Sequence, residues 1–402
     1  MRSIRFGEGK KPFVATDSRT SLRILLFSDY FEPLITGTVI STRLQMDGLI
    51  QSGHSVKLIS TSYAPNKNLP HVEWLPSLRL PGRIAYTTPL PFPSKVNLIC
   101  RDFQPEIIHI QHPFLSGILG LRAAAKLGIP KVYTFHTLLD EYLHYFPIPR
   151  PLALKLVRRL LHYVCSSVDS VIAPSSGARD YLMRIGVRSR IEIIPSGIDI
   201  SKFVVRRSDK KNITESRAST EQVLLYVGRC VKEKNLNFLL SEFAKVLSVV
   251  KTVKLVIVGD GPEKNNLISY GQKLGISQQV SFEGRVNYAN IQDYYHRADL
   301  FVFPSLSETQ GIVLVEALAA GIPIVALRGP GQEDVIIDRE NGFLCAPNEF
   351  AYRIAELLVN RSLYNSFRNR TRSNLQRFSV ERTSQQIVSL YSELINSSSK
   401  RS

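Results

Sequence analysis

The stretch Phe303-Pro-Ser-Leu-Ser-Glu308-Thr-Gln-Gly311-Ile-Val-Leu-Val-Glu316-Ala-Leu-Ala-Ala-Gly321 joins the end of a strand, a polar turn and a helix. The apolar run Leu300 to Phe303 predicts a buried strand that stops at Pro304. The residues after the turn predict a helix that begins near Gly311 and ends at Gly321. A strand, a loop and a helix form the repeating unit of an α/β sheet, so this stretch indicates the fold class.

The start of this helix is suited to binding a phosphate. The first amides of a helix lack partners within the helix, and the macrodipole adds positive charge there. Gln310, Gly311, Ile312 and Val313 would supply these amides. We predict that Glu308 faces the hydroxyls of a nucleotide sugar and that Glu316 faces the ribose diol. The alternative is that Ser305 to Glu308 form a capping box and that Glu316 is a solvated helix residue.

Length and charge narrow the class of protein. A chain of 402 residues with 44% apolar and 21% charged residues is long enough for two or three globular domains. The net charge of +17 indicates an anionic partner, which is a nucleic acid, a phosphorylated substrate or an acidic membrane surface. Charge alone does not choose among these partners.

The sequence contains no sign of a membrane span, a disulfide framework or a metal site. No apolar run reaches 18 residues, and Met1 to Ser21 lack the apolar core of a signal peptide, so we expect a cytoplasmic protein. The four cysteines are far apart in the sequence, and we expect them to be reduced thiols. No Asp-x-Asp pair is present, which favours a mechanism without metal, and we expect no cofactor.

Short apolar runs alternate with amphipathic segments along both halves of the chain, which predicts two doubly wound parallel sheets. The predicted strands are residues 23–29, 55–60, 107–110, 132–135, 170–173, 191–194, 223–227, 254–258, 280–283, 300–303 and 324–326, with an irregular Pro-rich excursion up to about residue 94. The predicted domains are a polar leader (1–21), an N-terminal domain (22–198), a flexible charged linker (204–221), a C-terminal domain (222–380) and a C-terminal helix with a polar tail (381–402).

Several candidate site residues follow directly after predicted strands, where ligands bind in such sheets. His136 comes after residues 132–135 and faces the expected crevice, although a lone histidine is more often structural. Gly37 opens a helix and would let the backbone approach a ligand, unless it only makes a tight turn. Arg229 and Lys234 place positive charge where a diphosphate could bind, unless they belong to a solvated turn.

A basic amphipathic helix is predicted from Pro151 to Tyr163. Its spacing places one basic face and one apolar face on the helix. The basic face consists of Lys155, Arg158, Arg159 and His162, and the apolar face of Leu152, Leu156, Leu160 and Tyr163. Such a helix can lie on an anionic bilayer, but many buried helices also carry a basic outer face.

These residues together resemble the retaining GT-B glycosyltransferases of family 4. The resemblance rests on Arg229 with Lys234, on Gly259-Asp-Gly-Pro262 and Phe282-Glu-Gly284, and on Glu308 followed eight residues later by Glu316. It implies two Rossmann-like domains that face each other across a cleft, with the donor on the second domain and the acceptor on the first. It further implies that Arg229 and Lys234 bind the diphosphate and that Glu308 and Thr309 to Val313 contact the donor. Arg285 and Val286 would lie near the base. His136 would line the reacting centre, and Gly37 would approach the diphosphate from the opposite side.

Two features are similar to the diacylglycerol glucosyltransferases within that family. Many members have an aromatic residue where this chain has Gln310, and the segment from Thr134 to Tyr145 is followed by the basic helix. The chain departs from the family pattern in the loop after the first strand, where it has Gly37-Thr38 and the family usually has Gly-Gly. The resemblance implies a monomer, peripherally associated with the membrane, that transfers glucose from UDP-glucose to a lipid hydroxyl.

Other functions remain as alternatives at this stage. Within the same class they are a mannosyltransferase that acts on a phosphoinositide-like lipid, or a transferase with a soluble acceptor. A nucleotide-sugar epimerase or a phosphorylase would share the architecture. A nucleic-acid-binding module would explain the charge, but the basic residues lack an aromatic stacking sheet or a helix-turn-helix pattern, so we expect no nucleic acid partner.

Overall fold

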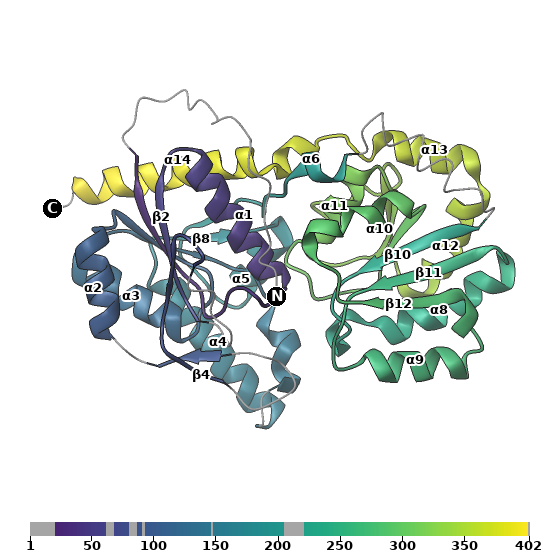
Figure 1. The fold of residues 1–402 in the computed structure, drawn as a ribbon, viewed down its shortest axis with the longest axis horizontal. Coiled ribbons are helices and arrows are strands. Elements are labelled where there is room, and N and C mark those ends of the chain that lie inside the picture. The colour runs from purple at the N-terminus through teal and green to yellow at the C-terminus, as the bar shows by residue number, and fades with distance from the viewer. Residues whose placement is uncertain are drawn as a thin grey trace. The chain divides into compact units, whose positions relative to one another are not determined.

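The computed structural model describes residues 21–61, 68–79, 87–90, 93–145, 148–204 and 221–400. The chain divides into two units, each built on its own parallel sheet (Figure 1). One unit runs up to Gly197 and resumes at Ser379, and the other spans Ile198–Phe378. The predicted leader, apart from Ser21, and residues 205–220 of the predicted linker lie outside the described residues.

The N-terminal unit contains a seven-stranded sheet in the order β3-β2-β1-β6-β7-β8-β9, and all of its pairings are parallel. Because the chain first adds β2 and β3 on one side of β1 and then returns to place β6 on the other, the strand order reverses between β1 and β6. The loops after these two strands therefore diverge and leave a crevice at the carboxyl edge. The strands are β1 (Arg23–Phe27), β2 (Ser55–Ser60), β3 (Val72–Trp74), β6 (Ile107–Ile110), β7 (Lys131–Thr134), β8 (Ser170–Ala173) and β9 (Ile191–Ile193).

Helices cover both faces of this sheet because the side chains of each strand alternate between two cores. Leu25 and Phe27 point into a core shared with α2, α3, α4 and α5, whereas Ile24 and Leu26 point into a core shared with α1 and α14. The helices are α1 (Gly37–Gln51), α2 (Pro93–Phe103), α3 (Leu115–Leu127), α4 (Arg150–Ser166), α5 (Ser176–Arg184) and α14 (Val380–Ser399).

The C-terminal unit contains a six-stranded sheet in the order β12-β11-β10-β13-β14-β15, again with parallel pairings throughout. Its strand order reverses between β10 and β13, so the loops after these strands flank the crevice of this unit. The strands are β10 (Gln222–Val227), β11 (Val253–Val258), β12 (Val280–Gly284), β13 (Leu300–Phe303), β14 (Ile324–Leu327) and β15 (Gly342–Cys345).

Two groups of helices pack within the C-terminal unit. The helix α8 contacts α9 and α12, and α11 contacts α6 and α10. Their bounds are α6 (Ile200–Phe203), α8 (Leu236–Val249), α9 (Lys264–Lys273), α10 (Gln292–Arg297), α11 (Ile312–Ala320) and α12 (Phe350–Val359), and α13 (Arg361–Arg370) follows α12.

The predicted doubly wound α/β class is confirmed, and the predicted strands differ from the observed ones only at their ends. The Pro-rich excursion is less irregular than expected, because it contains β3 and the antiparallel pair β4 (Ser77–Arg79) and β5 (Thr87–Pro89). The helix α14 continues to Ser399, so most of the predicted polar tail belongs to this helix.

The helix α14 packs on the N-terminal unit although it is far away in sequence. Tyr391 is fully buried, and Ile387, Leu390 and Leu394 join the core that contains α1 and β1. The two helices approach closely at Gly48, where an added Cβ would overlap the side chains of Ser384 and Val380. Glycine at this position therefore sets the distance between α1 and α14.

We expect Gly48→Leu to destabilise the N-terminal unit by about 1–3 kcal/mol, because the added side chain overpacks the contact between α1 and α14. Helix propensity alone would favour leucine over glycine by about 1 kcal/mol, so a net loss identifies the steric effect. Urea unfolding measures the difference. The control is Gln51→Leu, which adds the same side chain at an exposed position of α1 and should change stability little. Equal effects of the two changes would contradict this packing.

Candidate active site

The loops after β10 and β13 are joined by an ion pair between Lys234 and Glu308. The Lys234 ammonium donates to Oε1 of Glu308, and Ser305 Oγ donates to the same oxygen at 3.0 Å. The two charged side chains are 14% and 18% exposed. A second hydrogen bond joins the same two loops, because the side-chain amide Nδ2 of Asn235 donates to the carbonyl of Pro304 at 3.2 Å. The structure thus brings together two residues that the sequence placed 74 positions apart.

The helix predicted in the opening stretch is α11, and it begins where the sequence indicated. Gly311 is its N-cap with φ of 81°, a left-handed conformation that glycine adopts without strain. Ile312 and Val313 open the helix, so their amides lack intrahelical partners. The capping-box alternative is wrong, because no side chain caps α11 and Ser305 bonds to Glu308 instead.

Thr309 and Gln310 are buried in the turn before α11. Gly331 lies directly against them, since a Cβ there would come within 2.5 Å of the Gln310 amide nitrogen. Gln332 Nε2 donates to the carbonyl of Ser305 at 2.5 Å and fixes the other end of the turn. The polar turn is therefore held by the segment after β14 as well as by Lys234.

Glu316 is buried within the C-terminal unit rather than solvated, so the alternative of an exposed helix residue is wrong. Its two carboxylate oxygens accept hydrogen bonds from Tyr288 at 2.9 Å and from Tyr295 at 2.6 Å. Burial raises the pKa of Glu316, and the two tyrosines oppose that shift. The Lys202 ammonium lies 3.4 Å from the centroid of the Tyr288 ring, and burial lowers the pKa of Lys202 to about 8. The contact of Glu316 with a ribose stays a prediction.

The remaining predicted residues of the C-terminal unit lie in the loops at the same edge of the sheet. Arg229 follows β10 and is partly buried, and Arg285 and Val286 follow β12. The Arg285 side chain is exposed, and Val286 is half-buried. Because the carboxyl ends of parallel strands meet at one edge, all three share that edge with Glu308.

The N-terminal unit presents a buried polar group at its own carboxyl edge. Asp29 follows β1, His112 follows β6 and His136 follows β7. Asp29 Oδ1 accepts from the Ser116 amide at 2.9 Å, and burial raises the pKa of Asp29 to about 6. His136 Nε2 lies 2.7 Å from Oε1 of Gln111, and burial lowers the pKa of His136 to about 4.

Gly37 is the first residue of α1, whose N-cap is Thr36. The side chain of Thr36 accepts from the Val39 amide at 3.2 Å. A Cβ added at Gly37 would meet no protein atom within 4 Å, so packing does not require glycine there. Open space beside Gly37 is compatible with the predicted approach to a ligand.

Comparisons with known proteins identify the family. Residues 35–202 match the Glycosyltransferase Family 4 description, and residues 208–374 match the Glycosyl transferases group 1 description. An alpha-monoglucosyldiacylglycerol synthase of Streptococcus pneumoniae is 35% identical over 357 residues, which cover 84% of this chain and 78% of that protein. The chain is a family 4 glycosyltransferase. It is therefore a retaining, nucleotide-sugar-dependent enzyme.

Further relatives agree in family and in fold. An alpha-monoglucosyldiacylglycerol synthase of Acholeplasma laidlawii is 27% identical over 94% of this chain and 99% of its own. Sucrose-phosphate synthase from Thermosynechococcus elongatus superposes with a TM-score of 0.80 at 22% identity, over 94% of this chain and 100% of its own. HepE of Anabaena in complex with UDP-glucose superposes with a TM-score of 0.74 at 22% identity, over 92% and 99% of the two chains. The predicted GT-B fold is confirmed.

The basic helix of this glycosyltransferase is α4, and the side chains that it buries are not those of the predicted apolar face. Ala153, Val157, Leu161 and Val164 face the protein. Of the predicted apolar face, Leu160 packs against the core, whereas Leu152, Leu156 and Tyr163 are 49%, 50% and 53% exposed. Lys155, Arg158 and Arg159 are exposed as well, and Arg158 donates to Asp140 at 2.7 Å. The outer surface of α4 is thus both apolar and basic.

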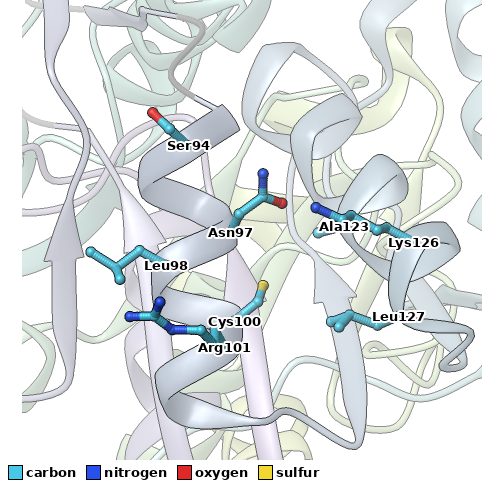
Figure 2. A pocket seen from close by; sticks show the side chains of 8 residues that line it. All are labelled: Ser94, Asn97, Leu98, Cys100, Arg101, Ala123, Lys126 and Leu127. Atoms are coloured by element: carbon cyan, nitrogen blue, oxygen red, sulfur yellow. The ribbon is translucent and has the colours of Figure 1, made fainter.

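A groove of about 490 Å³ lies between α2 and α3, with Leu98 and Arg101 on one wall and Lys126 and Leu127 on the other (Figure 2). The helix α3 starts at the carboxyl edge of the sheet and runs back, so its last turn lies toward the amino edge. None of the predicted site residues lines this groove, and we do not assign it to the active site.

Across the described ranges, no group of three or more His, Cys, Asp or Glu side chains is arranged to hold a metal ion. Among the helices described, none is both long enough and apolar enough to cross a bilayer.

Sequence reasoning missed the polar residues around His136. His109, Gln111 and His112 are buried, and Tyr391 reaches them from α14. A signal was present, because His109 interrupts the apolar run of a strand that is buried on both faces and Gln111 and His112 follow it directly. No sequence signal indicated that Tyr391 contacts His109, because only tertiary packing brings α14 next to β6.

We expect Lys234→Ala and Glu308→Gln each to lower kcat by about 10²–10³-fold, because each removes a charged group of the site. Steady-state kinetics measures the loss, and thermal unfolding tests whether the fold is intact. The matched control is Lys232→Ala, which removes an exposed positive charge two residues away in the same loop. Comparable losses for Lys232 and Lys234 would show that only the general charge of the loop matters.

We expect acid to destabilise the N-terminal unit between about pH 6.5 and pH 4. Burial lowers the pKa of His109 and of His112 to about 3, and that of His136 to about 4, so the unfolded chain binds more protons in this range. Each such histidine adds a slope of about 1.4 kcal/mol per pH unit. Asp29 has the opposite effect on stability. Its raised pKa lets the folded state bind one more proton than the unfolded state between about pH 4 and 6, which reduces the slope there.

Urea unfolding at a series of pH values measures this slope. The change His112→Asn removes one histidine that is protonated only in the unfolded chain, so it should reduce the slope of the free energy of unfolding against pH by about 1.4 kcal/mol per pH unit. The same replacement at His162, which is exposed on α4, should leave the slope unchanged. A slope that does not respond to His112→Asn would contradict the prediction.

Proposed function

We propose that this glycosyltransferase transfers a hexose, glucose from UDP-glucose, to the hydroxyl of a membrane lipid such as diacylglycerol. The observation that carries the proposal is the outer surface of α4, where Leu152, Leu156 and Tyr163 are exposed among cations. Exposed apolar side chains beside lysine and arginine are typical of a helix that lies in the interface of an anionic bilayer. The names of the relatives from S. pneumoniae and A. laidlawii support a diacylglycerol-type acceptor.

The donor is assigned to the C-terminal unit. Arg229 and Lys234 bind the diphosphate, Glu308 accepts hydrogen bonds from the sugar hydroxyls, and Arg285 and Val286 lie at the base. The turn from Thr309 to Val313 contributes backbone amides, and Glu316 faces the ribose. UDP-glucose is the donor favoured here, since HepE, which shares the fold, binds it.

Transfer proceeds on one face of the sugar ring. The bond from the anomeric carbon to the diphosphate oxygen breaks, the acceptor oxygen bonds to the same face, and the acceptor proton passes to the departing diphosphate. The protein stabilises the charge of that leaving group through Arg229 and Lys234 and positions the reactants. His136 and Gly37 belong to the N-terminal unit, and we assign His136 to the reacting centre.

Membrane association follows from charge and apolar contact together. Each lysine or arginine near an anionic surface contributes about 1 kcal/mol, and the chain has a net charge of +17. Lys155 and Arg159 are the cations of α4 that lie beside the exposed leucines, whereas Arg158 also holds Asp140. The enzyme is therefore a peripheral, monotopic membrane protein in this proposal, and it needs no metal.

The test of function is transfer by the purified protein to vesicles of anionic phospholipid with diacylglycerol. Labelled UDP-glucose should yield a glycolipid whose new linkage has the anomeric configuration of the donor. UDP-galactose and GDP-mannose, and vesicles that contain a phosphoinositide, distinguish the alternative hexosyl transfers. Transfer only to soluble sugars, without vesicle binding, would overturn the lipid acceptor.

We expect the combined change of Lys155, Arg158 and Arg159 to Ser to weaken vesicle binding at least about tenfold, since three cations near the surface are lost. Vesicle sedimentation measures it, and UDP-glucose binding should stay unchanged. Because Arg158 also pairs with Asp140, the double change of Lys155 and Arg159 should show the same direction with less structural effect. The matched control removes two exposed cations of α3, Arg122 and Lys126. An equal loss of donor binding in the α4 variants would show that the helix is structural.

A further inference from the structure

Ser305 is a completely buried residue of the polar turn before α11, and the proposed function does not use it. Its hydroxyl donates to Oε1 of Glu308 at 3.0 Å, and the ammonium of Lys234 donates to the same oxygen. An ionised carboxylate accepts hydrogen bonds and donates none, so the hydroxyl hydrogen of Ser305 points to Glu308. One carboxylate oxygen of Glu308 therefore has two protein donors.

The second carboxylate oxygen of Glu308 is available to a ligand. Among the residues that the structure describes, both hydrogen bonds to this carboxylate end on Oε1 and none ends on Oε2. The side chain of Glu308 is 18% exposed, and Oε2 does not belong to the buried side-chain oxygens that lack a partner. Because a carboxylate oxygen carries two lone pairs, Oε2 can accept from one or two hydroxyls of a sugar.

The backbone of Ser305 is held on both sides. Asn235 Nδ2 donates to the carbonyl of Pro304 at 3.2 Å, and Gln332 Nε2 donates to the carbonyl of Ser305 itself at 2.5 Å. Ser305 and Gln332 are both completely buried, so water does not compete for these contacts. The hydroxyl of Ser305 therefore has a fixed position beside Glu308.

Ser307, the other serine of this turn, does not take the hydrogen of Ser305. The hydroxyl of Ser307 donates to the carbonyl of Glu233 at 3.2 Å. The two serine oxygens are 3.4 Å apart, which is longer than the range of about 2.5–3.0 Å for a hydrogen bond between hydroxyls. The amide of Ser307 lies 3.5 Å from Oγ of Ser305 and can donate to it. The carboxylate of Glu308 is thus the acceptor for Ser305.

We propose that Ser305 is a positioning residue for the donor sugar, whose hydroxyl occupies Oε1 of Glu308 together with Lys234 and leaves Oε2 to accept from the sugar hydroxyls. This inference rests on the proposed function in assigning Glu308 to the sugar. An ammonium on a flexible stem attracts a carboxylate from many directions. A hydroxyl on a fixed backbone selects one oxygen and one side-chain conformation, so Ser305 supplies the orientation that Lys234 cannot.

Loss of the Ser305 hydroxyl should misplace Glu308 without removing its charge. A hydrogen bond to a charged group and the accurate placement of a reacting group both contribute to turnover, so we expect Ser305→Ala to lower kcat/KM for UDP-glucose by about 10-fold to 100-fold. The affinity for UDP should stay unchanged, because UDP lacks the sugar that Glu308 binds in this proposal.

The first experiment tests whether Ser305 acts through Glu308. Ser305→Ala is introduced into the wild-type enzyme and into Glu308→Ala, and kcat/KM is measured with labelled UDP-glucose and diacylglycerol vesicles. We expect the loss in the wild-type background and no further loss in Glu308→Ala, since the residue that Ser305 positions is then absent. Titration calorimetry measures the affinity for UDP. Ser281→Ala removes an exposed hydroxyl of β12 and should keep the wild-type values.

Three results of this experiment would overturn the proposal. They are a wild-type kcat/KM in Ser305→Ala, the same loss in both backgrounds, and a loss of UDP affinity as large as the loss of kcat/KM. The last result would mean that Ser305 only keeps the turn folded.

The second experiment tests the contact itself and needs no donor. Urea unfolding of Ser305→Ala, Glu308→Ala and the double variant should give losses in the free energy of unfolding that do not add, because both changes remove the same hydrogen bond. Additive losses would contradict the contact. If Ser305→Ala does not fold, Ser305→Cys replaces it in both experiments, since a thiol is only a weak donor.

The two experiments separate this inference from the proposed function. If the wild-type enzyme turns over no UDP-glucose with any lipid while the losses in stability do not add, the proposed function is rejected and the orientation of Glu308 by Ser305 stands. If UDP-glucose is transferred to lipid and Ser305→Ala matches the wild-type enzyme, the inference is rejected and the proposed function stands.

Discussion

The parallel pairing of β10 with β13 is the constraint on which the candidate site depends. These strands are adjacent in the sheet although 72 residues lie between Val227 and Leu300, because β11 and β12 are added on the far side first. The pairing sets the register of Leu224 against Leu300, so the loops after both strands leave the sheet at the same level. Lys234 and Glu308 can therefore meet, and the turn before α11 is held from two sides.

The same constraint acts in the N-terminal unit between β1 and β6, with a different chemical result. The groups there are neutral or poorly solvated, because burial lowers the pKa of three histidines and raises that of Asp29. In the C-terminal unit, by contrast, opposite charges compensate each other at Lys234 and Glu308. A charged pair suits the binding of a diphosphate and a sugar, whereas a neutral group suits a place where positive charge develops.

Local sequence signals predicted much of the fold, and particular residues show why. The run Leu300–Phe303, the stop at Pro304 and the glycines at 311 and 321 predicted β13 and α11 to within one residue, because turn and cap geometry is a property of a few neighbouring residues. Glu308 was predicted to be a site residue for the same local reason. Its partner could only be inferred from the expectation that loops after parallel strands share an edge.

The sequence was less informative wherever a side chain has two possible surroundings. Helical spacing put Leu152, Leu156, Leu160 and Tyr163 on an apolar face, but it could not tell whether that face meets the core or the solvent. In the structure Leu160 packs against the core and the other three side chains are exposed. Glu316 was expected to be either solvated or at a ribose, and the structure excludes the solvated alternative, because Tyr288 and Tyr295 donate hydrogen bonds to its buried carboxylate. By itself the sequence determined the α/β class, most of the strands and the two ends of α11, since these depend on backbone preference and apolar periodicity over a few residues. Only the tertiary structure decided the ion pair of Lys234 with Glu308, the burial of Glu316 and the contact of Tyr391 with His109, because each joins segments whose meeting depends on the whole sheet.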